Sequence, residues 1–531
     1  MKPLLLRTKL LIPALLLYLG LMLGYSWMSP EVSAPNERTR LYLALAMVER
    51  QELTIDQEIR RHGKVFDLSK KDGHYYTDKA PGSSFLAVPA VWIYKMSRPK
   101  KEKLSIEALN DLVRRWVMIP MTLLGLLALF GAMKRLDLPS RLGAQMLAAL
   151  AIGTPLFHYG AAFYGHALVL SFASLSAYFM LRTKQPNATE KPNKNNAIEP
   201  TTKDLVSFAA ASFSAAMCFF IEYQGAIFCV AFALAFLSRR ERLAIKPILA
   251  AAAGALLPVG ATLLYNKLAF GGFLTTSYQY LAHASSVEAH EKGLFGIMLP
   301  TAESLHGLFL SPARSLLFTA PLGLIGFAGL FWLWKRSRTT AIYGGVAMLL
   351  VTLVTLGFHV PFWGFGQRLM VPILGFSTLA AASLMFELEQ KRPLISFALK
   401  GWIAFAMLYN VLVSTAFPEF PAEITNPLQS VALPIIAQDS VSTNLGGLYL
   451  QSRAATGLYP LYLMTALAIA YLLAPLKRLE PKRLFAGIAI ALTLASLLGV
   501  MVWRTPEERH PAKLEKWQNW AMNLRWHPVM K

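Results

Sequence analysis

Two short segments near the start of the chain place acids in a setting suited to acid–base chemistry. The first, PNERTRLYLALAMVER, has Glu37 at the start of an apolar helical pattern; the second, DGHYYTDKAPG, has Asp78 and Lys79 before a proline–glycine turn. A carboxylate held near a hydroxyl can take its proton during group transfer. A lysine beside it can hold a phosphate oxygen. Further candidates for substrate binding in these segments are Asn36, Arg40, Tyr75 and Tyr76.

Each acid also has an ordinary structural explanation. Glu37 would stand in the first turn of a helix, where the helix dipole alone favours an acid. Asp78 and Lys79 could form a surface ion pair, which contributes only about 0–1 kcal/mol. The motif around Glu37 favours a general base there, so we predict Glu37 as the base. Asp78 is the second choice, because the aromatic residues and the turn around it indicate a fixed site.

Other ionisable residues stand at the ends of apolar segments farther along the chain. Arg314 in SPARSL and Arg368 in FWGFGQR are predicted to hold phosphate together with Lys79, because a guanidinium can contact two phosphate oxygens at once. The alternative for an arginine at such a place is that it only reaches the lipid headgroups. His166 in FYGHAL and Glu222 in FFIEYQGA are candidate substrate contacts, with an interfacial histidine and an exposed loop acid as the alternatives.

The composition is that of a membrane protein. Of the 531 residues, 55% are hydrophobic and 15% are charged, whereas soluble proteins carry about 25% charged residues. The net charge of +22 comes mainly from lysines and arginines in alternate short loops, which is typical of cytoplasmic loops. No basic surface with interleaved aromatic residues stands apart from the apolar segments, so we expect no nucleic-acid partner.

Apolar runs predict an all-α, polytopic fold with about 13 transmembrane helices. Glu37–Leu53, in the first outer loop, is instead predicted to lie in the membrane interface. Phe85–Met96, just after that loop, is too short to span alone and is predicted to be a second interfacial or re-entrant segment. Arg114 and Lys400, at or beside span ends, are expected to reach the nearer headgroups. The predicted spans are Leu10–Met28, Val113–Met133, Leu142–Phe157, Ala167–Leu181, Leu205–Ile221, Ala226–Leu237, Ile248–Leu268, Leu316–Trp334, Ile342–His359, Leu369–Phe386, Gly401–Phe417, Leu458–Leu476 and Leu484–Trp503.

The loop charges place the N-terminus in the cytoplasm and the C-terminal tail outside. We predict one transmembrane domain over residues 1–531, with residues 29–84 forming the first outer loop, which would be catalytic. The polar segment 184–203, rich in proline and asparagine, is predicted to be a disordered cytoplasmic linker. The remaining outer segments are expected at 269–314, 418–457 and 504–531.

Several motifs together resemble the integral-membrane glycosyltransferases of the GT-C fold, among them bacterial aminoarabinose transferases and protein O-mannosyltransferases. NERTRLYLALAMVER is similar to the segment after their first span, and DGHYYTDKAPG is similar to their YxEKPP-type turn. The later stretches LAFGGF with SYQY, LFLSPARSLLFTAPL and FWGFGQRLMVPIL resemble a bacterial branch of the superfamily, so the resemblance covers most of the chain. Asn36-Glu37 stands where relatives often have two acids in a row, so the base position corresponds to Glu37 or to its neighbour. Asp78-Lys79-Ala80-Pro81 replaces Glu-Lys-Pro-Pro, which leaves the substrate class open.

The resemblance implies an inverting transfer of a sugar from a polyprenyl-phosphate carrier to a glycan, lipid or protein acceptor. The reaction would take place at the outer face of a bacterial inner membrane, in contact with membrane lipids. It requires no certain cofactor, and a divalent metal ion remains a candidate. A transporter or flippase of a lipid-linked saccharide is the alternative, although such a protein would place its ionisable groups inside the spans. A transferase similar to O-antigen ligases would lack the first-loop acid.

Overall fold

The computed structural model describes residues 18–20, 22, 24, 34–98, 105–183, 200–239, 245–294, 296–358, 364–439, 441, 456–505 and 515–516. Most of the predicted first span Leu10–Met28, most of the linker 184–203, and much of the segments 418–457 and 504–531 lie outside the described residues. The polypeptide is almost entirely helical, and one short antiparallel hairpin is present among the described residues. The all-α prediction is therefore confirmed.

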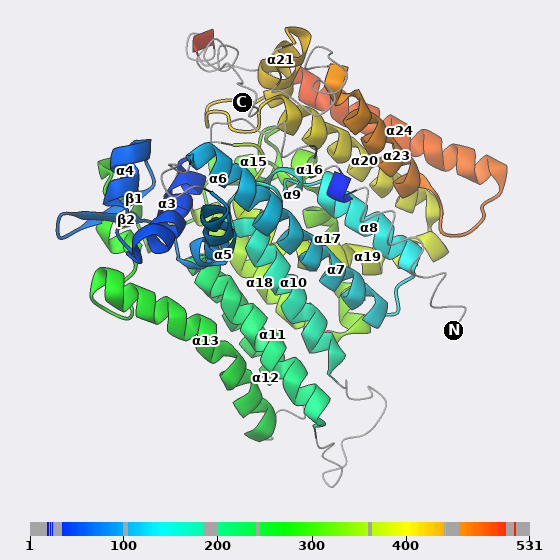
Figure 1. Cartoon of the computed structure of the whole chain (residues 1–531). Helices are drawn as coiled ribbons and strands as arrows, with labels where there is room; N and C mark the ends of the chain where they lie inside the picture. Colours follow the sequence, from blue (N-terminus) through cyan, green and yellow to red (C-terminus); the bar gives the residue numbers. More distant parts are fainter. Residues whose placement is uncertain are drawn as a thin grey trace.

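The first described segments fold into one unit, called here the first-loop unit, at residues 34–98. Figure 1 shows it in blue at one end of the helix bundle. Its elements are α3 (Pro35–Arg50), α4 (Asp56–His62), β1 (Leu68–Lys71), β2 (His74–Thr77) and α5 (Gly82–Met96). The hairpin pairs Leu68 with Thr77 and Lys71 with His74, and its turn is Asp72-Gly73, a pair that favours tight two-residue hairpins.

The helices α3 and α5 of the first-loop unit differ in how much of their surface is exposed. Residues Asn36–Ala46 of α3 are nearly all buried, although the sequence pattern predicts a helix with one polar face in the membrane interface. The helix α5 matches its prediction better, because Trp92, Ile93 and Met96 expose an apolar surface. Packing of α3 against α5 therefore places the catalytic candidates of α3 inside the protein.

The remaining helices form the bundle. Its first half contains α6 (Ile106–Val113), α7 (Ile119–Arg135), α8 (Ser140–Ile152), α9 (Leu156–Tyr159), α10 (Gly165–Arg182), α11 (Thr202–Ile221), α12 (Ala226–Leu237) and α13 (Ile245–Phe270). Its second half contains α14 (Ala284–Glu291), α15 (Ala302–Phe309), α16 (Leu316–Thr319), α17 (Pro321–Arg336), α18 (Arg338–Gly357), α19 (Leu374–Lys391), α20 (Pro393–Ala416), α21 (Leu433–Ala437), α23 (Tyr459–Leu473) and α24 (Pro481–Arg504). The helix α11 packs on α10 and α13, α17 on α19, and α20 on α24.

Eight helical segments in the described part of the chain are long and apolar enough to cross a membrane, and three shorter helices are also apolar. The chain is therefore a multi-pass membrane protein, and the total of about 13 spans stays a prediction. The longest segment, Ile106–Arg135, joins α6 to α7 through a π-helical turn at Arg114–Met118. Such a turn changes the direction in which side chains leave a helix and is frequent at functional sites.

One predicted position of a charged side chain is wrong. Lys400 does not reach headgroups: it is fully buried in α20, and its Nζ lies 2.5 Å from the Glu389 Oε1. Glu389 also accepts hydrogen bonds from the Ser396 hydroxyl and the Leu476 amide. Because an unpaired buried charge is costly, this pair ties α19 and α20 to the segment after α23.

Candidate active site

Glu37 is held by hydrogen bonds from three residues. Its residue is 1% exposed, and its carboxylate accepts hydrogen bonds from both Nη2 and Nε of Arg114 at 2.8–3.1 Å. The Phe163 amide donates to Oε1 at 2.8 Å, and the Ala34 amide donates to Oε2 at 3.1 Å. Glu37 therefore joins the start of α3 to the π-helical turn of Arg114 and to the loop before α10. Its oxygens are already engaged before any substrate binds.

Arg114 was expected to reach the lipid headgroups, and that prediction is wrong. The residue is 5% exposed and pairs with Glu37 across 77 positions of the chain. A bidentate contact of this kind fixes both partners in one geometry. The pair therefore sets where the first-loop unit sits on the bundle.

Asp78 has a different environment, although it lies in the same unit. Its Oδ2 accepts a hydrogen bond from the Lys79 Nζ at 2.9 Å, while its Oδ1 is buried and has no hydrogen-bond partner among the described residues. The Ser277 hydroxyl donates to the Asp78 carbonyl at 2.8 Å and so anchors this turn to the segment before α14. Burial raises the pKa of Asp78 to about 6, although Lys79 acts to lower it.

Lys79 lies between two acids. Its Nζ is 2.9 Å from the Asp78 Oδ2 and 3.0 Å from the Asp67 Oδ2. Burial alone would lower the pKa of Lys79, but these two carboxylates raise it above its ordinary value. Its side chain remains 15% exposed, so a charged ammonium can still meet a ligand.

Arg40 connects the first-loop unit to the turn between α11 and α12. Its Nη2 donates to the Glu222 Oε1 at 2.5 Å, its Nη1 donates to the Ser83 hydroxyl, and its Nε donates to the Asn36 Oδ1. Burial would raise the pKa of Glu222, but Arg40, His166 and Lys79 together outweigh burial, so the pKa lies below its ordinary value. Glu222 is therefore ionised at neutral pH.

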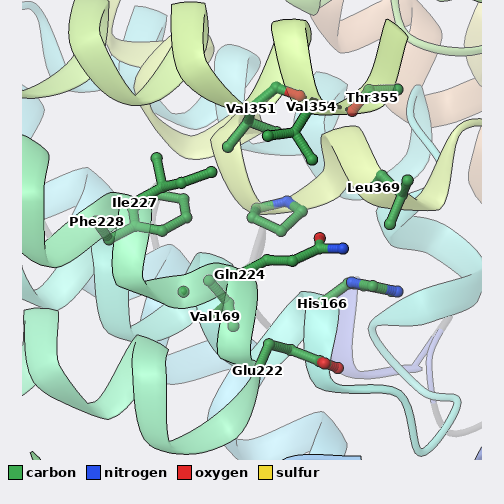
Figure 2. Close-up of a pocket in the computed structure, with 12 residues that line it drawn as sticks. His166, Val169, Glu222, Gln224, Ile227, Phe228, Val351, Val354, Thr355 and Leu369 are labelled. Carbon is green, nitrogen blue, oxygen red and sulfur yellow. Dashed lines mark hydrogen bonds between the residues drawn. The ribbon is translucent and has the colours of Figure 1, made fainter. Parts of the chain in front are cut away.

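The predicted residues His166 and Glu222 share a small cleft between α10, α12 and α18. Figure 2 shows His166, Gln224 and Glu222 on one side of it, opposite Val351, Val354 and Thr355. The cleft thus combines a polar end with apolar walls. Glu222 also touches the space beside Gly165: a Cβ added there would lie 2.1 Å from the Glu222 Oε1.

The two predicted phosphate-binding arginines, Arg368 and Arg314, have different partners. Arg368 is half-buried, and its guanidinium lies 5.6 Å from the centre of the Tyr164 ring. Arg314 donates to the Ala422 carbonyl at 3.0 Å and lies over the Phe420 ring, and burial lowers its pKa to about 10. Arg314 therefore fastens the segment that follows α20.

The two tyrosines of the hairpin that were predicted as substrate contacts, Tyr75 and Tyr76, lie in different surroundings. Tyr75 is flanked by the Lys64 and Lys70 ammonium groups, each about 5 Å from its ring centre, and its amide binds Asp56. Tyr76 packs against Phe270 at the end of α13. Their geometry supports a hairpin fixed to the bundle, and their role as sugar contacts stays a prediction.

A half-buried carboxylate that could not be selected from the sequence, Glu419, lies near Arg368. The Glu419 Oε1 is 3.0 Å from the His158 Nε2 and accepts a hydrogen bond from the Tyr164 hydroxyl at 3.1 Å. These partners are about 260 positions away along the chain. The available sequence signal is an acid within the apolar, proline-flanked stretch FPEFP, together with a histidine in LFHYG.

Among the described residues, no group of three or more His, Cys, Asp or Glu side chains is placed so that it could hold a metal ion.

No family model matches the chain, and no curated protein matches its sequence. Among solved structures, the chain is similar to ArnT from Cupriavidus metallidurans bound to undecaprenyl phosphate, with 14% sequence identity, a TM-score of 0.47 and coverage of 94% of this chain and 78% of that one. It is also similar to the Archaeoglobus fulgidus oligosaccharyltransferase, with 12% identity, a TM-score of 0.40 and coverage of 96% of this chain and 57% of that one. Similarity this distant leaves the chemistry to be argued from the residues of this chain.

Proposed function

We propose that this protein is an inverting glycosyltransferase that moves a hexose or pentose from a polyprenyl-phosphate carrier to an envelope acceptor. The observation that carries this proposal is the Asp78 carboxylate, which is buried, has one oxygen without a partner among the described residues, and has a pKa raised to about 6. An unsatisfied buried oxygen in a structure calls for an explanation, and a bound hydroxyl supplies one. A base with a pKa near the working pH is suited to accept the proton of that hydroxyl.

The proposed step is a single displacement. The acceptor oxygen attacks C1 of the sugar, its proton passes to the Asp78 Oδ1, and the bond between C1 and the phosphate oxygen breaks. The electron pair of that bond leaves with the polyprenyl phosphate, which gains negative charge. Attack from the side opposite the phosphate inverts the configuration at C1.

The developing charge needs cations in fixed positions. Lys79 and Arg368 are the proposed donor contacts, because both keep part of their side chain accessible and Lys79 contacts the candidate base directly. Arg314 was predicted in the same role, and we propose that it contributes by holding the segment of Glu419. His166, Glu222 and the neighbouring Arg40 and Asn36 are proposed to line the site, with Tyr75 and Tyr76 at its rim.

Between the two acids, the structure supports Asp78 as the base. Glu37 accepts five hydrogen bonds through its two oxygens, which leaves it little capacity for an acceptor hydroxyl. We propose that Glu37 is instead a positioning residue that acts through Arg114. The site would face the outer side of a bacterial inner membrane, and the acceptor would belong to lipopolysaccharide or cell-wall glycan.

Reconstitution tests the proposal against the transporter alternative. Membrane lipids from cells that lack this protein contain both unused donor and unused acceptor. Purified protein in detergent, without vesicles, should convert them to polyprenyl phosphate and a glycosylated acceptor, both detected by mass spectrometry. Conversion that requires a second enzyme, with this protein only moving the lipid between the leaflets of proteoliposomes, contradicts the proposal.

A further inference from the structure

Glu419, His158 and Tyr164 form a second cluster of polar side chains, which takes no part in the proposed displacement step. The Glu419 side chain is 15% exposed, and its Oε1 is fully engaged by His158 and Tyr164. Its Oε2 accepts no hydrogen bond from any of the described residues. A carboxylate oxygen carries two lone pairs, so Oε2 can accept two further hydrogen bonds.

The segment around Glu419 is held rigidly. The Gly364 amide donates to the Phe420 carbonyl and the Phe365 amide donates to the Pro418 carbonyl, both at 2.9 Å, so residues on either side of Glu419 are paired with the chain at 364–365. Arg314 holds the Ala422 carbonyl from the other side. A fixed carboxylate loses little entropy when it binds a ligand, which is the property of a recognition site.

Gly364 packs closely against this carboxylate. Its φ is +114°, a value that glycine adopts readily and other residues avoid. A Cβ added there would lie 3.4 Å from the Glu419 Oε2 and 3.0 Å from the Tyr159 hydroxyl oxygen. Glycine at position 364 therefore avoids crowding the Glu419 Oε2 and the Tyr159 hydroxyl oxygen. Both oxygens lie beside the same glycine, and both can accept hydrogen bonds from a ligand that presents hydroxyl groups.

We propose that Glu419 recognises the transferred sugar by accepting hydrogen bonds from two neighbouring hydroxyl groups of its ring. This inference rests on the proposed function. The sugar is the expected occupant because it is bonded directly to the phosphate, and Arg368, the proposed phosphate contact, lies over the ring of Tyr164, which itself holds Glu419. Glu419 is thus a specificity residue of the donor site, and His158 and Tyr164 are its positioning residues.

Binding assays test this assignment without turnover. Purified protein in nanodiscs would bind radiolabelled farnesyl phosphate, and unlabelled farnesyl phosphate and its glucosyl, mannosyl, galactosyl and arabinosyl derivatives would compete with it. The measured quantity is the sugar gain, defined as the affinity for the best sugar derivative divided by the affinity for farnesyl phosphate. Hydrogen bonds to a charged group contribute enough that Glu419→Gln should reduce this gain about tenfold or more, with farnesyl phosphate binding unchanged.

Matched variants separate recognition from folding. Glu423→Gln removes the same charge from an exposed residue of the same loop and should leave the sugar gain unchanged. Tyr164→Phe removes only the hydroxyl that orients Oε1 and should lower the gain partially, even if Glu419→Gln folds poorly. A wild-type sugar gain in Glu419→Gln, or an equal loss for farnesyl phosphate itself, overturns the assignment. The phosphate contact fails separately if Arg368→Ala binds farnesyl phosphate as tightly as wild type.

Discussion

The sharpest prediction concerns Glu37, because its two proposed roles give opposite results. Glu37→Gln removes the negative charge that faces the Arg114 guanidinium while keeping the side-chain volume. Glu37 is 1% exposed and Arg114 is 5% exposed, so water cannot replace the lost partner. Breaking a buried ion pair on one side costs about 3–5 kcal/mol. We therefore expect the free energy of unfolding of Glu37→Gln to fall by about that amount.

Thermal unfolding of the purified protein in detergent measures the effect. Glu52→Gln is the matched control, since Glu52 lies just beyond the end of α3 and is exposed, and its melting temperature should equal that of wild type. The double variant Glu37→Gln/Arg114→Met should recover much of the lost stability, because replacing a buried pair with apolar groups is often neutral. Turnover per folded molecule should decline far less in Glu37→Gln than in a variant of the base.

The opposite pattern would refute this reasoning. If Glu37→Gln melts at the wild-type temperature and loses about 10²–10⁴-fold in turnover, Glu37 is the general base. Its contacts with Arg114 would then be those of an acid oriented for catalysis.

Wild-type turnover should increase as pH rises through about 6, because burial raises the pKa of Asp78 and only its ionised form accepts a proton. Because this pKa is raised in the folded protein, Asp78 stabilises the fold most below its ordinary pKa of about 4, and the contribution is lost as pH rises through 6. Asp78→Asn should therefore gain stability relative to wild type at pH 8 but not at pH 4. Arg368→Lys keeps a charge without the planar fork, so turnover should decrease substantially while the melting temperature stays near wild type; equal turnover would show that the fork is not needed. Cysteines introduced at Lys70 and Glu515, both exposed, should react with an impermeant maleimide added to intact cells, and failure of either site would contradict the predicted topology.

The helices could be predicted well because the signal for a membrane span is local. The predicted span Ala226–Leu237 coincides with α12, and Leu205–Ile221 and Ala167–Leu181 lie within two or three residues of α11 and α10. Apolar length alone decides such segments. The hairpin was missed although its Asp72-Gly73 turn is a strong local signal, since the strands beside it are only four residues long.

The site was harder to predict, because pairing depends on contacts between distant parts of the chain. Asp78-Lys79 and Arg368 could be selected from motifs. Nothing near Glu37 in the sequence indicates that Arg114 will donate hydrogen bonds to both of its carboxylate oxygens. An arginine or lysine near a span end was expected to reach headgroups, whereas Arg114 and Lys400 each meet a buried acid. The same limit hid Glu419, whose partners His158 and Tyr164 belong to another part of the bundle.

Asp78 is the proposed general base of the sugar transfer. The decisive measurement is mass spectrometry of polyprenyl phosphate and glycosylated acceptor formed in detergent by wild type and by Asp78→Asn, both checked for folding by their melting temperatures. We expect wild type to form the two products in equal amounts and Asp78→Asn to form them about 10²–10⁴-fold more slowly. Product formation by Asp78→Asn at the wild-type rate would contradict the central claim.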